Sequence, residues 1–328
     1  MTLTQTDHSV PTPAAANAER STGKETPSAD GSASGDEQSR GQEKPELRLV
    51  ASAEGNDEPT LLLLHGVTRC GNDWQPLMPA LKATWRVVSL DQRGHGESPR
   101  GASYLVTDYV ADAVRFVRDE LATPLVILGH SLGAMVAAAV AAKLPQLVRG
   151  IVLEDPPFHT MGNRIAGTAW QTQFIGMQEI ARRGGSVDEI TDALAELRLP
   201  SDDGGWKRLG DLRDRVSLRW SAQCLSRLDP EVLTPVIEGR WLTGYDLPTV
   251  FSRIRCPTLL LQADPGAGGA LTDADSDAAL AALSSCRHVR FPGCSHQLHR
   301  DHPEEVRQAL ADFAASFRPG DISPTKYH

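Results

Sequence analysis

The sequence has few cysteines, no long apolar run and no excess of positive charge. Its five cysteines show no Cys-x-x-Cys spacing, and such an odd, sparse set is typical of reduced thiols rather than of a disulfide framework or a zinc site. No apolar stretch approaches the roughly 18 residues that a membrane-spanning helix needs. With 33 basic and 42 acidic residues the net charge is −9, which argues against a nucleic-acid-binding surface. We therefore expect a cytoplasmic protein with neither a membrane span nor a nucleic-acid partner.

Aromatic residues are also scarce, and none precedes Trp74. Residues 1–46 are instead rich in Ser, Thr, Ala, Gly, Pro and Glu. A segment of this composition buries too little apolar surface to offset the chain entropy lost on folding, which predicts a disordered N-terminal tail. Its first residues form neither a basic stretch nor an apolar segment, so a secretory signal is not expected.

From residue 47 onward, segments of strand length alternate with segments of helical periodicity. Thr60–Leu64 is a continuous apolar run, typical of a strand buried on both faces. Val106–Leu121 carries its apolar residues on one helical stripe. This alternation predicts an α/β fold with a mostly parallel sheet covered by helices on both faces. The other expected strands are 47–52, 86–90, 125–128, 150–153, 257–261 and 288–291, and the other expected helices are 74–83, 132–144, 274–283 and 303–317.

Residues 156–255 interrupt the alternation. They show little strand signal, and a block of this length between two strands predicts an inserted helical lid on a core made of residues 47–155 and 256–328. The stretches in it that look helical are 169–183, 187–197, 212–228 and 230–238. Four tryptophans lie in the block, and for each we expect packing in the core rather than a place in a pocket wall: Trp170, Trp206, Trp220 and Trp241.

The segment Gly129-His-Ser-Leu-Gly133 matches the G-x-S-x-G motif, with Ser131 at its centre. It directly follows an expected strand and directly precedes an expected helix, which is the context that the motif requires. Glycines two residues before and after the serine permit a tight turn. The turn places the Ser131 hydroxyl at a helix N-terminus, where free N–H groups favour developing negative charge. We therefore predict that Ser131 is a nucleophile.

Four landmarks in chain order resemble the α/β-hydrolase superfamily, and more narrowly its lid-bearing, cofactor-free branch of serine hydrolases. They are Leu64-His65-Gly66, the run Asp91-Gln-Arg-Gly-His-Gly-Glu-Ser98, the motif around Ser131, and Gly293-Cys-Ser-His296. The resemblance spans roughly residues 47–317. It implies a sheet of about eight strands and a Ser-His-acid triad that needs no cofactor and no metal, and it gives His65 a structural role.

A serine hydroxyl needs a base, and in this family the histidine follows both the nucleophile and the acid along the chain. His296 is the candidate because a short Pro-Gly loop joins it to the preceding strand, which is the family's position. His299 and His302 are nearby alternatives. His302 directly precedes Pro303 and is expected to open the last helix.

Two aspartates are candidates for the acid, because the family carries it after either of two strands. Asp155 follows the strand after the nucleophile helix, and the neighbouring Glu154 is expected to point the other way. Asp264 follows a later strand, but two extra residues before Ala270 depart from the family's pattern. The sequence favours Asp155 and leaves Asp264 open. Either carboxylate would hold the tautomer of the histidine.

The resemblance places the oxyanion hole at the backbone N–H groups of Val67 and Leu132. Together these residues predict a serine hydrolase that cleaves an ester, a lactone or a related acyl bond, or a C–C bond, of a small apolar molecule through an acyl-enzyme at Ser131. Two alternatives stay open. One is a small-molecule receptor of the same fold with little turnover, and the other is a cofactor-free perhydrolase or haloperoxidase-like enzyme in which peroxide replaces water. The partner expected from the sequence is a small-molecule substrate.

Overall fold

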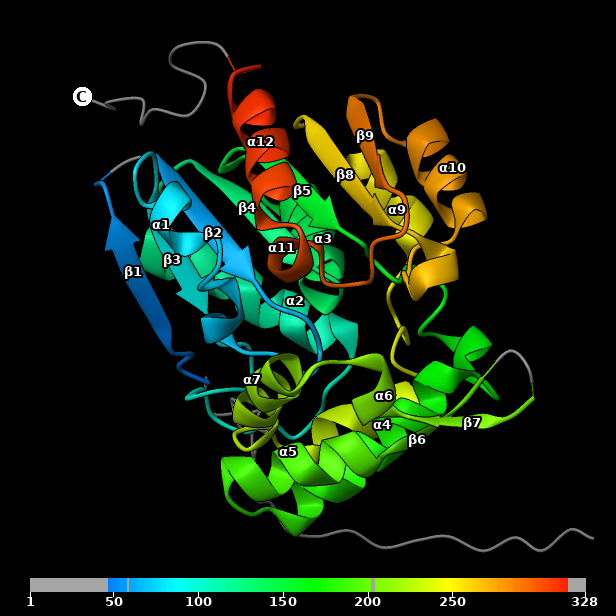
Figure 1. Ribbon diagram of the computed structural model, residues 1–328. Helices are drawn as coiled ribbons and strands as arrows, with labels where there is room; N and C mark the ends of the chain where they lie inside the picture. The colour runs from blue at the N-terminus through cyan, green and yellow to red at the C-terminus, as the bar shows by residue number, and fades with distance from the viewer. Residues whose placement is uncertain (1–46, 58, 202–203, 318–328) are drawn as a thin grey trace, which may run out of the picture. The chain divides into compact units, whose positions relative to one another are not determined.

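The structure, a computed structural model, describes residues 47–57, 59–201 and 204–317. The segment 1–46, predicted to be a disordered tail, lies outside the described residues. A seven-stranded sheet with strand order β1-β3-β2-β4-β5-β8-β9 forms the central layer (Figure 1). Strand β1 pairs antiparallel with β3, and the other pairings within this sheet are parallel. The strands are β1 Ala51–Gly55, β2 Thr60–Leu64, β3 Arg86–Leu90, β4 Leu125–His130, β5 Val148–Glu154, β8 Thr258–Ala263 and β9 Cys286–Phe291.

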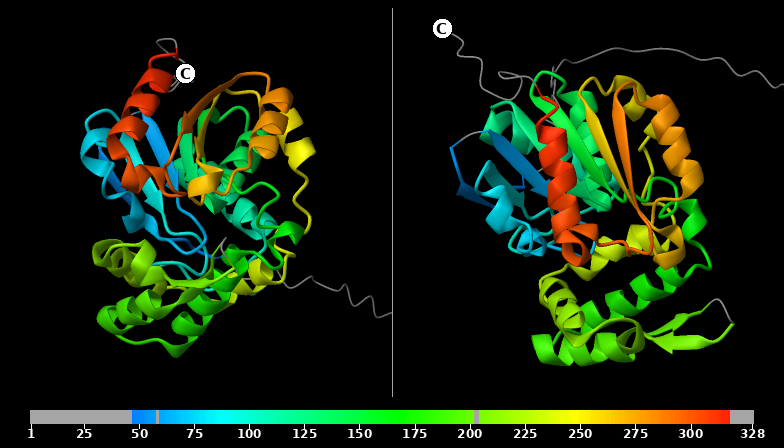
Figure 2. Two further views of the ribbon diagram at one scale, coloured as in Figure 1. Left: turned by 45° about the vertical axis from the view of Figure 1, so that its right-hand side comes forward. Right: turned by 45° about the horizontal axis from the view of Figure 1, so that its top comes forward.

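Helices cover both faces of the sheet, as the alternation of strands and helices predicts. Leu62 and Leu64 of β2 pack on the face covered by α2 (Val106–Arg115) and α3 (Leu132–Lys143). Leu61 and Leu63 belong to the opposite face, where α1 (Met78–Leu81) and α12 (Pro303–Ala314) lie; Figure 2 shows α12 running across this face. All of β2 is buried, which explains the continuous apolar run in its sequence. Helix α10 (Asp273–Ala282) follows β8, and the short helix α11 (Leu298–Asp301) precedes α12.

In the sheet and the segment that follows β2, three features differ from the sequence-based predictions. The first strand is Ala51–Gly55 rather than 47–52, and because it is an exposed edge strand no apolar alternation marks it. The stretch predicted as one helix over 74–83 is a 3₁₀ turn, Gly71–Trp74, followed by the short helix α1. Pro76 lies between them and has no N–H group with which to continue a helix. Finally, the described part of the sheet has seven strands rather than about eight.

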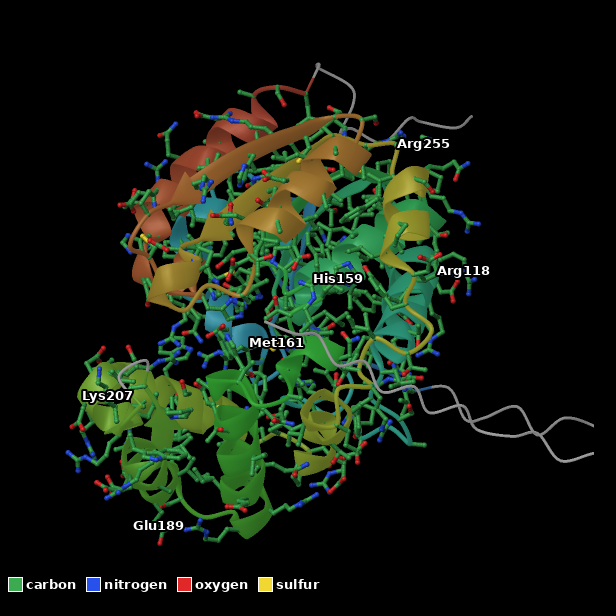
Figure 3. The ribbon with its side chains drawn as sticks, turned by 90° about the vertical axis from the view of Figure 1, so that its right-hand side faces the viewer. Arg118, His159, Met161, Glu189, Lys207 and Arg255 are labelled. Carbon is green, nitrogen blue, oxygen red and sulfur yellow. The ribbon has the colours of Figure 1, made fainter. Side chains whose placement is uncertain are left out.

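The segment 156–255, which we call the inserted segment, supplies the elements between β5 and β8. Its helices α4 to α7 gather at the end of the sheet toward which the parallel strands point (Figure 1). Figure 3 shows Glu189 and Lys207 of this segment far from Arg255, where the chain returns to the sheet. The helices are α4 Ala169–Arg183, α5 Val187–Glu196, α6 Leu209–Leu212, α7 Arg215–Leu225, α8 Thr234–Ile237 and α9 Leu247–Arg253.

The inserted segment also holds a small hairpin that the sequence did not predict. Strands β6 (Arg198–Pro200) and β7 (Trp206–Arg208) pair antiparallel, and three-residue strands are too short to carry a hydrophobic pattern. Trp206 on β7 is 62% exposed, so its predicted core position is wrong, whereas Trp241 is fully buried as predicted. No helix among the described residues is both long and apolar enough to cross a membrane.

Candidate active site

Ser131 occupies the sharp turn between β4 and α3. Its backbone adopts φ +54° and ψ −114°, a conformation that residues other than glycine rarely take. The turn leaves no room at its glycines: a β-carbon on Gly129 would lie 2.1 Å from the Gly133 carbonyl oxygen, and one on Gly133 would lie 1.9 Å from that of Leu64. The Ser131 N–H donates a 2.9 Å hydrogen bond to the Glu154 carbonyl. The side chain of Ser131 lines a cavity.

A hydrogen bond between His296 and Asp155 distinguishes Asp155 from Asp264, the other candidate acid. Nδ1 of His296 lies 2.5 Å from Oδ2 of Asp155. The Asp155 carboxylate is fully buried, and His296 lines the same cavity as Ser131. The Asp155 carboxylate also accepts backbone N–H bonds of 3.2, 2.7 and 3.3 Å from Ala263, Ala270 and Leu271, respectively. The ends of β4 and β5 and the loop after β9 therefore bring three of the predicted residues to one end of the sheet.

Asp264, the other candidate acid, caps a turn and does not contact His296 among the described residues. Its partly exposed carboxylate accepts N–H bonds of 2.8 Å from both Gly266 and Gly293. These two donors lower the pKa of Asp264 below its ordinary value. The described contacts of Asp264 do not include His296. The extra residues that set this loop apart in the sequence form the turn capped by Asp264, and the loop contributes backbone N–H groups to Asp155 in place of an acid.

The loop after β2 carries Val67, a predicted oxyanion donor, on the wall of the cavity. Among the described residues, no acceptor takes a hydrogen bond from the Val67 N–H. Leu132, the other predicted donor, is the first residue of α3, so its N–H has no carbonyl partner within the helix. Both N–H groups therefore remain available to a bound oxygen atom.

Two buried histidines hold this loop in place: His65, for which the sequence predicts a structural role, and His95, for which the sequence predicted no separate role. Nε2 of His95 lies 2.7 Å from the Val67 carbonyl oxygen, and Nε2 of His65 accepts a 3.1 Å bond from the Gln92 N–H. Burial and the neighbouring ring of His95 lower the pKa of His65 to about 4, and burial lowers that of His95. Both rings are therefore neutral near pH 7. The run from Asp91 to Ser98, recognisable in the sequence only as a family landmark, thus positions the Val67 loop.

His130, the residue before Ser131, ties the nucleophile turn to the loop that carries His296. Its Nε2 lies 2.9 Å from the backbone oxygen of His296, and the two rings lie 4.6 Å apart. Burial and the nearby rings of His296 and His299 hold the pKa of His130 well below its usual range. The neutral ring then donates its N–H to that carbonyl, a role that the motif did not reveal.

The cavity beside Ser131 is small and continues into a larger groove bordered by the inserted segment. The cavity itself measures about 30 Å³, room for roughly one water molecule, and the groove about 570 Å³. Trp170 of α4 packs against the hydrophobic core as predicted, but it also lines both the cavity and the groove, with its ring edge-on to that of His296 at 5.2 Å. Figure 3 shows His159 and Met161 where the chain leaves the sheet for the inserted segment.

A family model described as the alpha/beta hydrolase fold matches residues 59–303. The chain belongs to the α/β-hydrolase family. This hydrolase is 27% identical over 272 residues to the 2-(acetamidomethylene)succinate hydrolase of Mesorhizobium japonicum, covering 79% of this chain and 89% of the relative. It is 30% identical over 262 residues to the pimeloyl-[acyl-carrier protein] methyl ester esterase of Aromatoleum aromaticum, covering 78% and 98%. Both relatives are hydrolases, which supports a hydrolytic activity here.

Solved structures show the same fold. The N-formylmaleamic acid deformylase of Pseudomonas putida S16 superposes with a TM-score of 0.65 at 20% identity, over 81% of this chain and 96% of that one. The enol-lactonase of Burkholderia xenovorans LB400 superposes with a TM-score of 0.64 at 19% identity, over 82% and 97%. At these identities the likeness concerns the fold alone.

Behind the Ser131 turn, this α/β hydrolase has a buried charge cluster made of Arg69, Asp73, Glu154 and His299. Asp73 lies 2.5 Å from Arg69 Nη2 and 3.1 Å from His299 Nε2, and Glu154 lies 2.7 Å from His299 Nδ1. Burial opposes a charged imidazole, but the Glu154 and Asp73 carboxylates outweigh it and raise the pKa of His299 to about 9. Glu154 therefore points away from His296, as predicted, and His299 is a member of this cluster rather than part of the cavity wall.

Three described residues come close enough to hold a metal ion. The ligand atoms of His130, Glu154 and His299 all lie within 4.8 Å of one another. However, both ring nitrogens of His299 already face carboxylates, and its raised pKa favours the protonated ring, which cannot bind a metal. We therefore assign this trio to hydrogen bonding around the buried charge cluster rather than to a metal centre.

We expect the charge on His299 to make the stability of the hydrolase depend on pH. Since its pKa rises from 6.5 to about 9 on folding, its contribution is complete below about pH 6.5 and disappears as the pH rises through about 9. The pKa difference corresponds to roughly 3 kcal/mol of unfolding free energy. Urea unfolding of the wild type and of His299→Gln, across this range of pH, measures the contribution as a difference between the two curves.

The control is His159→Gln, because His159 is half-buried and no hydrogen bond to its ring is described. This variant should follow the wild-type curve. Equal pH slopes for the wild type and His299→Gln would show that the ring of His299 is uncharged in the folded protein.

Proposed function

We propose that the protein is a serine hydrolase that cleaves an ester, a lactone or a related acyl bond of a small molecule through an acyl-enzyme at Ser131. One observation carries the proposal. His296 lines the same cavity as Ser131 and is bound through Nδ1 to the buried carboxylate of Asp155. A serine in a strained turn, on the wall of the same cavity as a histidine that a carboxylate orients, fits the arrangement that activates a hydroxyl as a nucleophile.

In the proposed reaction, Nε2 of His296 takes the proton of the Ser131 hydroxyl as its oxygen attacks the acyl carbon. The backbone N–H groups of Val67 and Leu132 stabilise the oxyanion that forms. His296 then gives the proton to the leaving group, and a water molecule, activated in the same way, releases the acid from Ser131. Asp155 holds the ring so that Nδ1 carries a proton and Nε2 is free to accept one.

The buried carboxylate of Asp155 suits this role because its donors hold it in place against His296. Three backbone N–H groups and His296 Nδ1 converge on its two oxygens. These bonds fix the carboxylate next to Nδ1 of His296, where it can stabilise the imidazolium that forms during the reaction.

The inserted segment acts as a lid in this proposal. Trp170, Phe174 and Met177 of α4 line the cavity beside Ser131, so a substrate has to pass or displace them to reach the hydroxyl. The groove of about 570 Å³ is in the range of small-molecule sites. The relatives' names include an enol-lactonase and a methyl ester esterase, and hydrolysis is the chemistry that these names share.

A serine-directed fluorophosphonate probe and a panel of 4-nitrophenyl esters test the proposal. We expect one probe molecule per chain, located on Ser131 by peptide mass spectrometry, and many turnovers of at least one ester. Ligand-induced stabilisation with no turnover would instead favour a receptor. Peracid formation in hydrogen peroxide that exceeds ester hydrolysis would favour a perhydrolase.

A further inference from the structure

Arg213 places an unpaired positive charge on the wall of the cavity. It lies between α6 and α7 in the inserted segment, is half-buried, and lines both the cavity beside Ser131 and the adjoining groove. Within the described part of the chain, its guanidinium group makes no ion pair and donates no hydrogen bond. The neighbouring arginines of the inserted segment differ in this respect: Arg208 pairs with Glu196, Arg215 with Asp192 and Arg219 with Asp188.

The other arginine that lines the cavity, Arg69, already has hydrogen-bond and ion-pair partners. Arg69 is 2% exposed, and its guanidinium lies 2.5 Å from Asp73 and 2.9 Å from the Ser221 hydroxyl oxygen. Burial and the nearby charge of Arg69 lower the pKa of Arg213, whereas the charge of Asp301 opposes this change. Arginine nevertheless stays charged in proteins. Arg213 therefore carries its positive charge in surroundings that disfavour that charge.

The side chains around Ser131 supply no counter-charge. The described residues that line the cavity include two arginines and neither an aspartate nor a glutamate. Two carboxylates line the outer groove, but each already has donors. Asp214 caps α7 by accepting N–H bonds from Val216 and Ser217, and Asp301 accepts a 2.6 Å bond from the Ser295 hydroxyl.

A guanidinium half-removed from water and left unpaired is costly, and a carboxylate is the group that its planar fork fits best. We propose that Arg213 binds a carboxylate group of the substrate, so that the substrate is an acyl compound carrying a free carboxylate in addition to the bond attacked by Ser131, rather than the small apolar molecule expected from the sequence. This inference rests on the proposed hydrolase function. The carboxylates of Asp214 and Asp301 along the groove disfavour a more highly charged group, such as a phosphate dianion, beside Arg213.

Two matched esters test this proposal. Mono-4-nitrophenyl adipate and 4-nitrophenyl hexanoate have the same acyl length and leaving group, and they differ in the terminal carboxylate. We expect the wild type to prefer the adipate ester, and Arg213→Gln to lower the adipate-to-hexanoate ratio of kcat/KM by about 10- to 100-fold, as the loss of a charge-assisted hydrogen bond predicts. Most of this change should appear in KM, because the contact is present before as well as during the reaction.

Arg215→Gln is the control, because Arg215 begins α7, two residues further on, and pairs with Asp192 on the surface. It should leave the ratio unchanged. Arg213→Lys keeps the charge without the fork and should retain part of the preference. If Arg213→Gln lowers kcat/KM for both esters by the same factor, or for neither, Arg213 does not bind the carboxylate.

A binding measurement separates failure of this inference from failure of the proposed function. The Ser131→Ala variant should be stabilised against heat by millimolar adipate, and the Ser131→Ala, Arg213→Gln double variant should not. This readout needs no turnover. A wild type that hydrolyses neither ester and takes no fluorophosphonate overturns the hydrolase, whereas active wild type with equal adipate stabilisation of both variants overturns the role of Arg213 alone.

Discussion

Replacing Ser131 with alanine is expected to lower kcat for 4-nitrophenyl ester hydrolysis by at least a thousand-fold. Alanine keeps the β-carbon, so the strained backbone at φ +54° changes little and the substitution removes only the hydroxyl. Loss of a serine nucleophile costs up to about 10⁶-fold in kcat where it has been measured in other hydrolases, and binding and the oxyanion hole supply the residual rate. Initial rates measured with saturating ester decide the outcome.

The matched control is Ser252→Ala, which removes from α9 an exposed hydroxyl whose described hydrogen bond goes to the Thr249 carbonyl of the preceding turn. Its kcat should equal that of the wild type. Thermal unfolding of both variants checks that the fold is intact. Near-wild-type activity in Ser131→Ala, or fluorophosphonate attachment at a different residue, would overturn the assignment of the nucleophile.

Replacing Asp155 with asparagine is expected to lower kcat by about 10⁴-fold, the loss typical of a triad acid. The amide cannot hold the tautomer in which Nδ1 of His296 donates and Nε2 accepts. It also brings two N–H donors into a place where three backbone N–H groups already converge. Asp155→Asn should therefore lose thermal stability as well as activity. Thermal unfolding and initial rates of ester hydrolysis, measured on the same preparation, check both losses.

Asp264→Asn provides the comparison that does not depend on this loss of stability. Asp264 accepts from Gly266 and Gly293 and makes no described contact with His296. An asparagine oxygen can still cap the turn, so we expect kcat within a few-fold of the wild type. A folded Asp264→Asn protein with a collapsed rate would transfer the acid's role to Asp264.

The aspartate that contacts His296 could not be identified from the sequence, because both candidates follow strands that end at the same edge of the sheet. The decision depends on backbone groups distant along the chain. Asp155 accepts from the N–H groups of Ala270 and Leu271, more than a hundred residues further on. The two extra residues in that loop showed in the sequence as a departure from the family's pattern. The structure explains them as the turn that Asp264 caps.

The positions of two tryptophans also depend on distant parts of the chain and could not be predicted from the sequence. Trp170 and Trp206 were expected in the core because most tryptophans pack there. Trp170 packs only partly against the core and also lies against the His296 ring at the cavity, whereas Trp206 lies exposed on the hairpin of the inserted segment. Nothing in the local sequence separates a tryptophan that packs in the core from one at a cavity wall, because the difference lies in which distant segment covers it.

The amino-acid order alone determined the sheet of alternating strands and helices, the position of the inserted segment and the turn that carries Ser131. Each of these depends on apolar periodicity or on glycines within a few residues of one another, where the physics is local. Tertiary structure alone decided that Asp155 rather than Asp264 meets His296, that His299 lies between two buried carboxylates, and that the guanidinium of Arg213 has no ion-pair or hydrogen-bond partner among the described residues. These depend on burial and on charges brought together from distant parts of the chain, and no local pattern encodes them.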